Sequence, residues 1–164
     1  MSSALSAFTL FHVMLSLVGI FSGFIVVYGM LTARRLNGWT SIFLWSTVLT
    51  SVTGYFFPFH KLMPSHILGA MSLVTLAIAI YARYTRNLAE GWRRTYVITA
   101  VLALYFNVFV LIVQLFEKVP ALHELAPTQS ETPFKLAQLA ALLVFIVLGF
   151  LAAKNFRADQ FSAA

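Results

Sequence analysis

The sequence predicts an all-α integral membrane protein in which five transmembrane helices form one bundle. Hydrophobic residues make up 60% of the 164-residue chain and charged residues only 10%, whereas a soluble domain is typically about half apolar and a quarter charged. The apolar residues come in long runs, and about 20 helical residues are enough to cross a ~30 Å hydrocarbon layer. We therefore expect residues 1–164 to form a single membrane bundle.

The first three apolar runs are separated by turn and basic residues. The first run, residues 8–31, has no basic segment before it and is longer than the core of a secretory signal, so we expect it to be retained as a span. An Asn-Gly turn precedes the second span at residues 39–57. Pro64 suits a first helical position, because its missing N–H would be unsatisfied there in any case. The third span then covers residues 65–82.

The last two runs flank the longest loop of the sequence. We expect the fourth span at residues 95–116 and the fifth at residues 134–153. The loop between them, residues 117–133, is rich in Pro, Glu, Thr and Ser. Asn107 lies near the middle of the fourth span, where an amide commonly forms a hydrogen bond to a neighbouring helix.

Small and hydroxyl-bearing residues mark two helical faces. Gly19 and Gly23 form a small-xxx-small pair that lets another backbone approach closely, and we expect it to serve packing within the bundle. The second span carries a polar stripe at helical spacing, which should face protein instead of lipid. Bonds between helices are one interpretation of this stripe, and the wall of a small-molecule or ion site is the other. The stripe consists of Thr40, Thr47, Thr50, Ser51 and Gly54.

Basic residues are distributed unevenly between the two sides of the predicted bundle. Eight fall on one side of the five-span arrangement and three on the other, which by the positive-inside rule places the N-terminus outside and the C-terminus in the cytoplasm. Because these residues flank apolar runs, the net charge of +6 does not predict nucleic-acid binding. The cytoplasmic group is Arg34, Arg35, Arg83, Arg86, Arg93, Arg94, Lys154 and Arg157, and the outer group is Lys61, Lys118 and Lys135.

All four histidines fall on the predicted outer side. His12 is 22 residues before Arg34 and His66 is 17 residues before Arg83, distances of roughly 33 Å and 25 Å along a helix. Both side chains should therefore lie near the outer interface, and the other two histidines fall in loops on the same side. The competing interpretation is that each histidine only reaches the head-group region or caps a helix.

Two cofactors are compatible with these histidines. Two imidazoles from facing helices at similar depth could ligate a haem b, for which His12 and His66 are the candidate pair. Gln114 and Gln138 lie at the outer ends of their own spans and could complete the site. The other cofactor is copper, because imidazole and thioether groups are suitable ligands for it. The candidate metal ligands are His60, Met63, His66 and His123.

These residues favour a redox-linked membrane protein that binds haem or metal. The alternative is a non-enzymatic accessory or assembly subunit, or a small-solute transport component, in a homo-oligomer or a larger membrane complex. Coupled transport is less favoured, because no ionisable residue lies deep within a predicted span. The sequence has no cysteine, which excludes disulfides and thiolate sites. It also has no nucleotide-binding loop, nucleophile elbow or HExxH motif.

Two segments carry a resemblance to other proteins. The sequences TSVTGYFFP at residues 50–58 and PALHELAPTQS at residues 120–130 resemble segments of small, uncharacterised multi-span bacterial inner-membrane proteins, and the likeness extends over most of the chain. It implies a helical bundle in a bacterial inner membrane and implies no activity. In architecture the chain is also similar to small membrane cytochromes of the b type, an analogy that assigns no residue a role.

Overall fold

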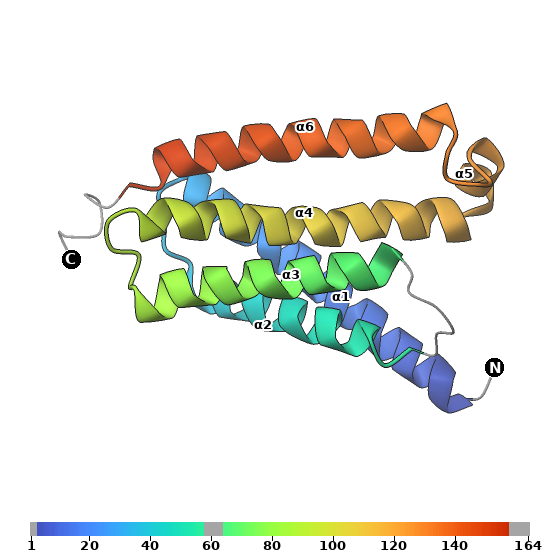
Figure 1. The fold of residues 1–164 in the computed structure, drawn as a ribbon, viewed down its shortest axis with the longest axis horizontal. Helices are drawn as coiled ribbons and strands as arrows, with labels where there is room; N and C mark the ends of the chain where they lie inside the picture. Colours follow the sequence, from blue (N-terminus) through green and yellow to red (C-terminus); the bar gives the residue numbers. More distant parts are fainter. Residues whose placement is uncertain (1–2, 58–63, 158–164) are drawn as a thin grey trace.

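The structure is a computed structural model that describes residues 3–57 and 64–157, and five long helices form its bundle. No strand occurs in these two ranges, which confirms the all-helical prediction. The start of α1 and the end of α6 lie at opposite ends of the bundle (Figure 1). The elements are α1 (Ser3–Leu31), α2 (Asn37–Gly54), α3 (Pro64–Ile80), the π-helix η1 (Tyr81–Thr85), α4 (Trp92–Lys118), the short α5 (Pro120–Leu125) and α6 (Thr132–Asn155).

Each of the five predicted spans corresponds to one of the long helices, with shifts at their ends. The third helix changes at Tyr81 from α to π geometry, and α4 begins at Trp92, three residues before the predicted start of that span. The predicted loop at residues 117–133 contains α5. Pro120 stands at the first turn of this short helix, where its missing N–H costs no hydrogen bond.

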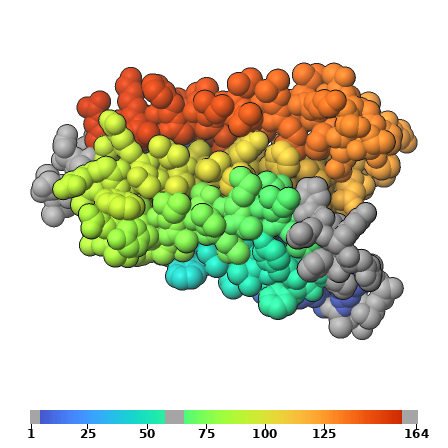
Figure 2. All heavy atoms as spheres, in the orientation of Figure 1, coloured from blue at the N-terminus to red at the C-terminus, as the bar shows by residue number. Residues whose placement is uncertain are grey.

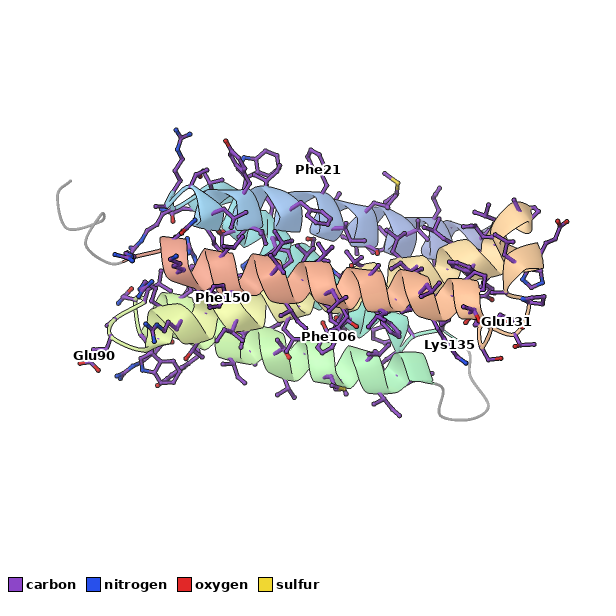
Figure 3. The ribbon with its side chains drawn as sticks, turned by 90° about the horizontal axis from the view of Figure 1, so that it is seen from above. Phe21, Glu90, Phe106, Glu131, Lys135 and Phe150 are labelled. Carbon is purple, nitrogen blue, oxygen red and sulfur yellow. The ribbon has the colours of Figure 1, made fainter. Side chains whose placement is uncertain are left out.

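In the described part of the chain, four helices are long and apolar enough to cross a membrane, as judged by length and composition. α2 is not among them, because seven Ser and Thr residues lower its apolar content. Large apolar side chains cover the outside of the bundle: Phe21 and Phe150 project outward, whereas Phe106 lies between helices (Figure 3). This exposed apolar surface fits a lipid bilayer. The four segments are Leu5–Leu31, His66–Thr85, Trp92–Lys118 and Thr132–Asn155.

α4 is the central helix of the bundle. It packs against α1, α3 and α6, and Figure 2 shows it between α6 and α3 on one face of the molecule. Tyr96, Val97 and Leu104 on α4 are almost completely buried. In the most apolar stretch of α4, 44% of the residues are buried, compared with 11% in the corresponding stretch of α6. α6 is therefore a peripheral helix that presents most of its surface to the surroundings.

α1 approaches its neighbours closely at the predicted glycine pair. A Cβ atom on Gly19 would lie 3.0 Å from Thr47 Oγ1 on α2. On Gly23 it would lie 2.6 Å from Leu104 Cδ1 on α4 and 2.9 Å from Phe43 Cε2 on α2. These separations confirm that the pair serves packing inside the bundle, because no larger residue fits without displacing its neighbours.

We expect Gly23→Ala to lower the free energy of unfolding by about 1–3 kcal/mol, the usual cost of overpacking. Leu104 and Phe43 are both buried and have little room to move away from the added methyl group. Gly38→Ala is the matched control, since a Cβ atom there has nothing within 4 Å. Thermal unfolding of the purified protein in detergent measures both variants. An unchanged unfolding midpoint for Gly23→Ala would contradict the close packing.

Candidate functional site

A cavity of about 110 Å³ lies among α1, α2, α3 and α4. His12 on α1 and His66 on α3, the two residues of the candidate haem pair, both line it. Both residues lie towards the end of the bundle at which α1 begins, α2 finishes and α3 begins (Figure 1). In the predicted topology this end faces the outside of the cell.

His12 is held by a hydrogen bond to α2. Its Nδ1 atom lies 2.8 Å from the hydroxyl oxygen of Thr53, and that hydroxyl donates its own proton to the carbonyl of Leu49 at 2.7 Å. Nδ1 of a neutral His12 must therefore carry the proton and donate it to Thr53. Nε2 is then left as a hydrogen-bond acceptor or metal ligand. An edge-on contact with the ring of Phe57 also helps to orient the imidazole.

His66 is buried near the start of α3, with 6% of its surface exposed. The hydroxyl of Tyr55 donates to the carbonyl oxygen of His66 at 2.6 Å, and the two rings pack against each other with centroids 5.6 Å apart. Gly69 leaves space for this tyrosine, because a Cβ atom there would lie 3.2 Å from its ring. Tyr55 thus connects the end of α2 to the start of α3 beside the cavity.

The polar stripe of α2 divides between the helix packing and the cavity. Thr40 and Thr47 are fully buried in the helix packing, and Thr50, Ser51 and Gly54 line the cavity. Besides the two histidines, the other helices each add one polar residue to the lining: Ser16 on α1, Ser72 on α3 and Asn107 on α4. The stripe faces protein, as predicted.

Two hydrogen bonds join neighbouring helices beside the cavity. The hydroxyl of Ser51 donates to that of Ser72 at 3.1 Å, joining α2 to α3. The amide of Asn107 donates to Thr47 at 3.2 Å, joining α4 to α2, which is the role expected for an amide in the middle of a span. Because these groups already have partners, they fix the shape of the cavity before any ligand enters.

The described lining of the cavity contains no Asp, Glu, Lys or Arg. Phe106 and Val110 on α4 add apolar surface. Among residues 3–57 and 64–157 no group of three or more His, Cys, Asp or Glu could hold a metal ion. The described site is therefore suited to a small uncharged ligand that forms hydrogen bonds.

Gln114, Gln138 and His123, the other predicted site residues that the structure describes, do not line this cavity. Gln114 donates to Glu117 at 3.4 Å, and Gln138 donates to the carbonyl of Phe109 at 3.2 Å while its own carbonyl oxygen is buried without a partner. His123 lies exposed on α5. The predicted metal ligands His60 and Met63 lie outside the described residues.

A haem needs more space than this cavity offers. Pockets for drug-sized ligands typically measure about 300–1,000 Å³, and the haem macrocycle is at least of that size class. At about 110 Å³ the cavity suits a single small ring or a few water molecules.

Comparisons with protein-family models, curated proteins and solved structures found no match, so the family resemblance stays a prediction.

We expect Tyr55→Phe to destabilise the protein by about 1 kcal/mol, the usual net value of one hydrogen bond. The ring stays in place against His66, but the bond to its carbonyl oxygen is lost. Tyr28→Phe is the control, because Tyr28 is exposed on the outside of α1. Thermal unfolding in detergent measures both, and equal midpoints for the two variants would contradict a structural role for the Tyr55 hydroxyl.

Proposed function

We propose that the chain is a multi-pass protein of a bacterial inner membrane that binds the head group of a quinone or quinol in the cavity between His12 and His66. The observation that carries this proposal is the convergence of two imidazoles in one small, uncharged cavity. It keeps the redox-linked role that the histidines suggested and replaces haem with a ligand of suitable size.

The chemistry of the lining fits such a head group. A quinone presents two carbonyl oxygens and a quinol two hydroxyl groups on a flat, uncharged ring. Nε2 of His12 is available to accept the hydrogen bond of a quinol hydroxyl. Phe106 offers an aromatic surface for the ring, and aromatic rings gain about 0.5–1.5 kcal/mol from such packing. The long tail of a membrane quinone would remain in the lipid.

We further propose that all five long helices cross the membrane, with the N-terminus outside and the C-terminus in the cytoplasm. α2 has 18 residues, or about 27 Å at 1.5 Å per residue, and it packs along α1 and α3. Its polar stripe is covered by those neighbours, so its composition is compatible with a buried position in a membrane bundle. The excess of basic residues on one side supports the orientation.

Single cysteines test this topology, because the natural sequence contains none. Gly38→Cys and Gly91→Cys are suited to labelling, since a Cβ atom at either position has nothing within 4 Å. Ser130→Cys adds an exposed position between α5 and α6. We expect a membrane-impermeant thiol reagent to label Ser130→Cys from outside intact cells, and the other two only after lysis. Labelling of residues 38 and 91 from opposite sides would show that α2 does not cross.

Ligand binding is tested with the protein purified in a mild detergent. We expect an organic extract to contain quinone, and a short-chain quinone to bind the extracted protein in calorimetric titration. His12→Ala and His66→Ala should each weaken that binding about tenfold or more, because each removes a polar group that contacts the ligand. His123→Ala is the matched control, since His123 is exposed on α5 away from the cavity. Unchanged binding in both cavity variants would contradict the proposal.

Copper is the second candidate ligand. The hydrogen bond from Nδ1 of His12 to Thr53 leaves Nε2 free to ligate a metal, a common arrangement in metal sites. Metal analysis and an absorption spectrum of the same preparation distinguish the ligands. Stoichiometric copper that is lost in His66→Ala would establish a metal site, and a Soret band would establish haem. A protein free of quinone, haem and copper would leave the accessory and solute-transport roles.

A further inference from the structure

A second cavity, of about 340 Å³, lies at the opposite end of the bundle. It is formed where α1 and η1 finish and α2 begins, together with the loop that leads into α4. In the proposed topology this end faces the cytoplasm. Its polar lining contains two arginines, two asparagines and two hydroxyl groups: Arg35, Arg83, Asn37, Asn87, Ser41 and Tyr84.

Arg83 is held in the wall of this cavity and does not extend freely into water. It is 8% exposed, and its guanidinium donates a hydrogen bond to the side-chain oxygen of Asn37 at the start of α2. The group also lies over the rings of Tyr84 and Tyr96, 5.8 Å and 5.3 Å from their centroids. A buried guanidinium is costly unless its charge is compensated, and none of these three neighbours is an anion.

Arg35 adds a second positive charge to the same cavity. Partial burial and the nearby charge of Arg83 both lower the pKa of Arg35, because two positive charges close to each other repel. The described residues that line the cavity include no carboxylate. An anion in the cavity would be attracted by both positive charges, and guanidinium groups form strong, charge-assisted hydrogen bonds with anions.

The start of α2 makes the same cavity more favourable for an anion. Asn37 is the first residue of α2, and no side chain caps this end of the helix. The unsatisfied backbone N–H groups and the positive end of the helix dipole both attract negative charge. This contribution comes from the backbone, so it is independent of the two arginines.

The backbone around the cavity is unusual in two respects. Arg83 belongs to the π-helix η1, a geometry that is frequent at functional sites. In the following loop Asn87, Leu88 and Glu90 have φ angles of 49°, 59° and 48°, the left-handed region that non-glycine residues seldom adopt. Asn87 and Leu88 line the cavity. Strain of this kind persists where the surrounding structure requires it.

We propose that this cavity binds a phosphate group, with the guanidinium groups of Arg35 and Arg83, the side chain of Asn87 and the start of α2 as its partners. Arginine is suited to this task because its planar donors match phosphate oxygens in pairs. The cavity is larger than a phosphate alone, so the group is carried either by an anionic phospholipid of the inner leaflet or by a soluble phosphate compound. This site is separate from the histidine cavity and does not depend on its ligand.

The test uses the full-length protein and two probes. Inorganic phosphate is titrated against the protein in neutral detergent, and the protein is also placed in lipid nanodiscs of phosphatidylcholine with or without phosphatidylglycerol. We expect at least one probe to raise the unfolding midpoint of the wild type. Stabilisation by inorganic phosphate identifies a soluble ligand, and stabilisation by phosphatidylglycerol alone identifies the lipid head group.

Arginine variants decide whether this cavity is the binding site. Arg35→Gln should weaken the response about tenfold or more, as for other charge-assisted hydrogen bonds. Arg94→Gln removes one charge from an exposed residue at the same end that does not line the cavity, and it should respond like the wild type. Arg83→Gln should also lose the response, but because Arg83 is buried, Arg35→Gln is the decisive variant. The proposal is overturned if neither probe stabilises the wild type, or if Arg35→Gln and Arg94→Gln respond alike.

Discussion

The close approach of α1 to α2 and α4 is the constraint on which the rest of the bundle depends. Without side chains at Gly19 and Gly23, α1 lies directly against Thr47 of α2 and Leu104 of α4. In a membrane a polar stripe must find its hydrogen-bond partners inside the protein, and this approach covers the stripe of α2. Ser16, which shares a face of α1 with the two glycines, lines the histidine cavity. The packing of α1 therefore determines the site as well as the fold.

Three hydroxyl groups of α2 form the same hydrogen bond within their own helix. Ser46, Thr50 and Thr53 each donate a proton to a carbonyl four residues earlier in their own helix. Their protons are satisfied locally, so their oxygen atoms remain available as acceptors for groups on other helices. His12 uses this capacity on Thr53. The hydroxyl protons of this polar helix are thus largely satisfied by its own backbone carbonyls. The bond between Thr53 and His12 shows how a hydroxyl oxygen can also hold a side chain at the cavity.

Helix positions were predictable from the sequence because apolar length and flanking charges act locally. That His12 and His66 lie at the same end of the bundle was also predictable, since both depths can be counted from basic residues. The exclusion of Gln114 and Gln138 from the cavity depends on helix rotation and on the peripheral position of α6, which residue spacing does not determine. No spacing rule connects Tyr55 to the carbonyl of His66. The basic cavity was missed because its arginines were interpreted only as markers of orientation.

The π-helix at the end of α3 changes the direction of every side chain that follows it. A π turn contains one residue more than the corresponding α turn, so the following residues are rotated by roughly 100° about the helix axis compared with a continuous α-helix. Up to Ile80 the side chains follow α-helical register along the apolar segment. The extra residue of the π turn changes the direction of the turn that carries Arg83, and the α-helical register before it is unchanged. A π turn has the geometry of a single-residue insertion, and here it lets the third helix bury the side chain of Arg83 at its end while the apolar turns before Ile80 keep their α-helical register.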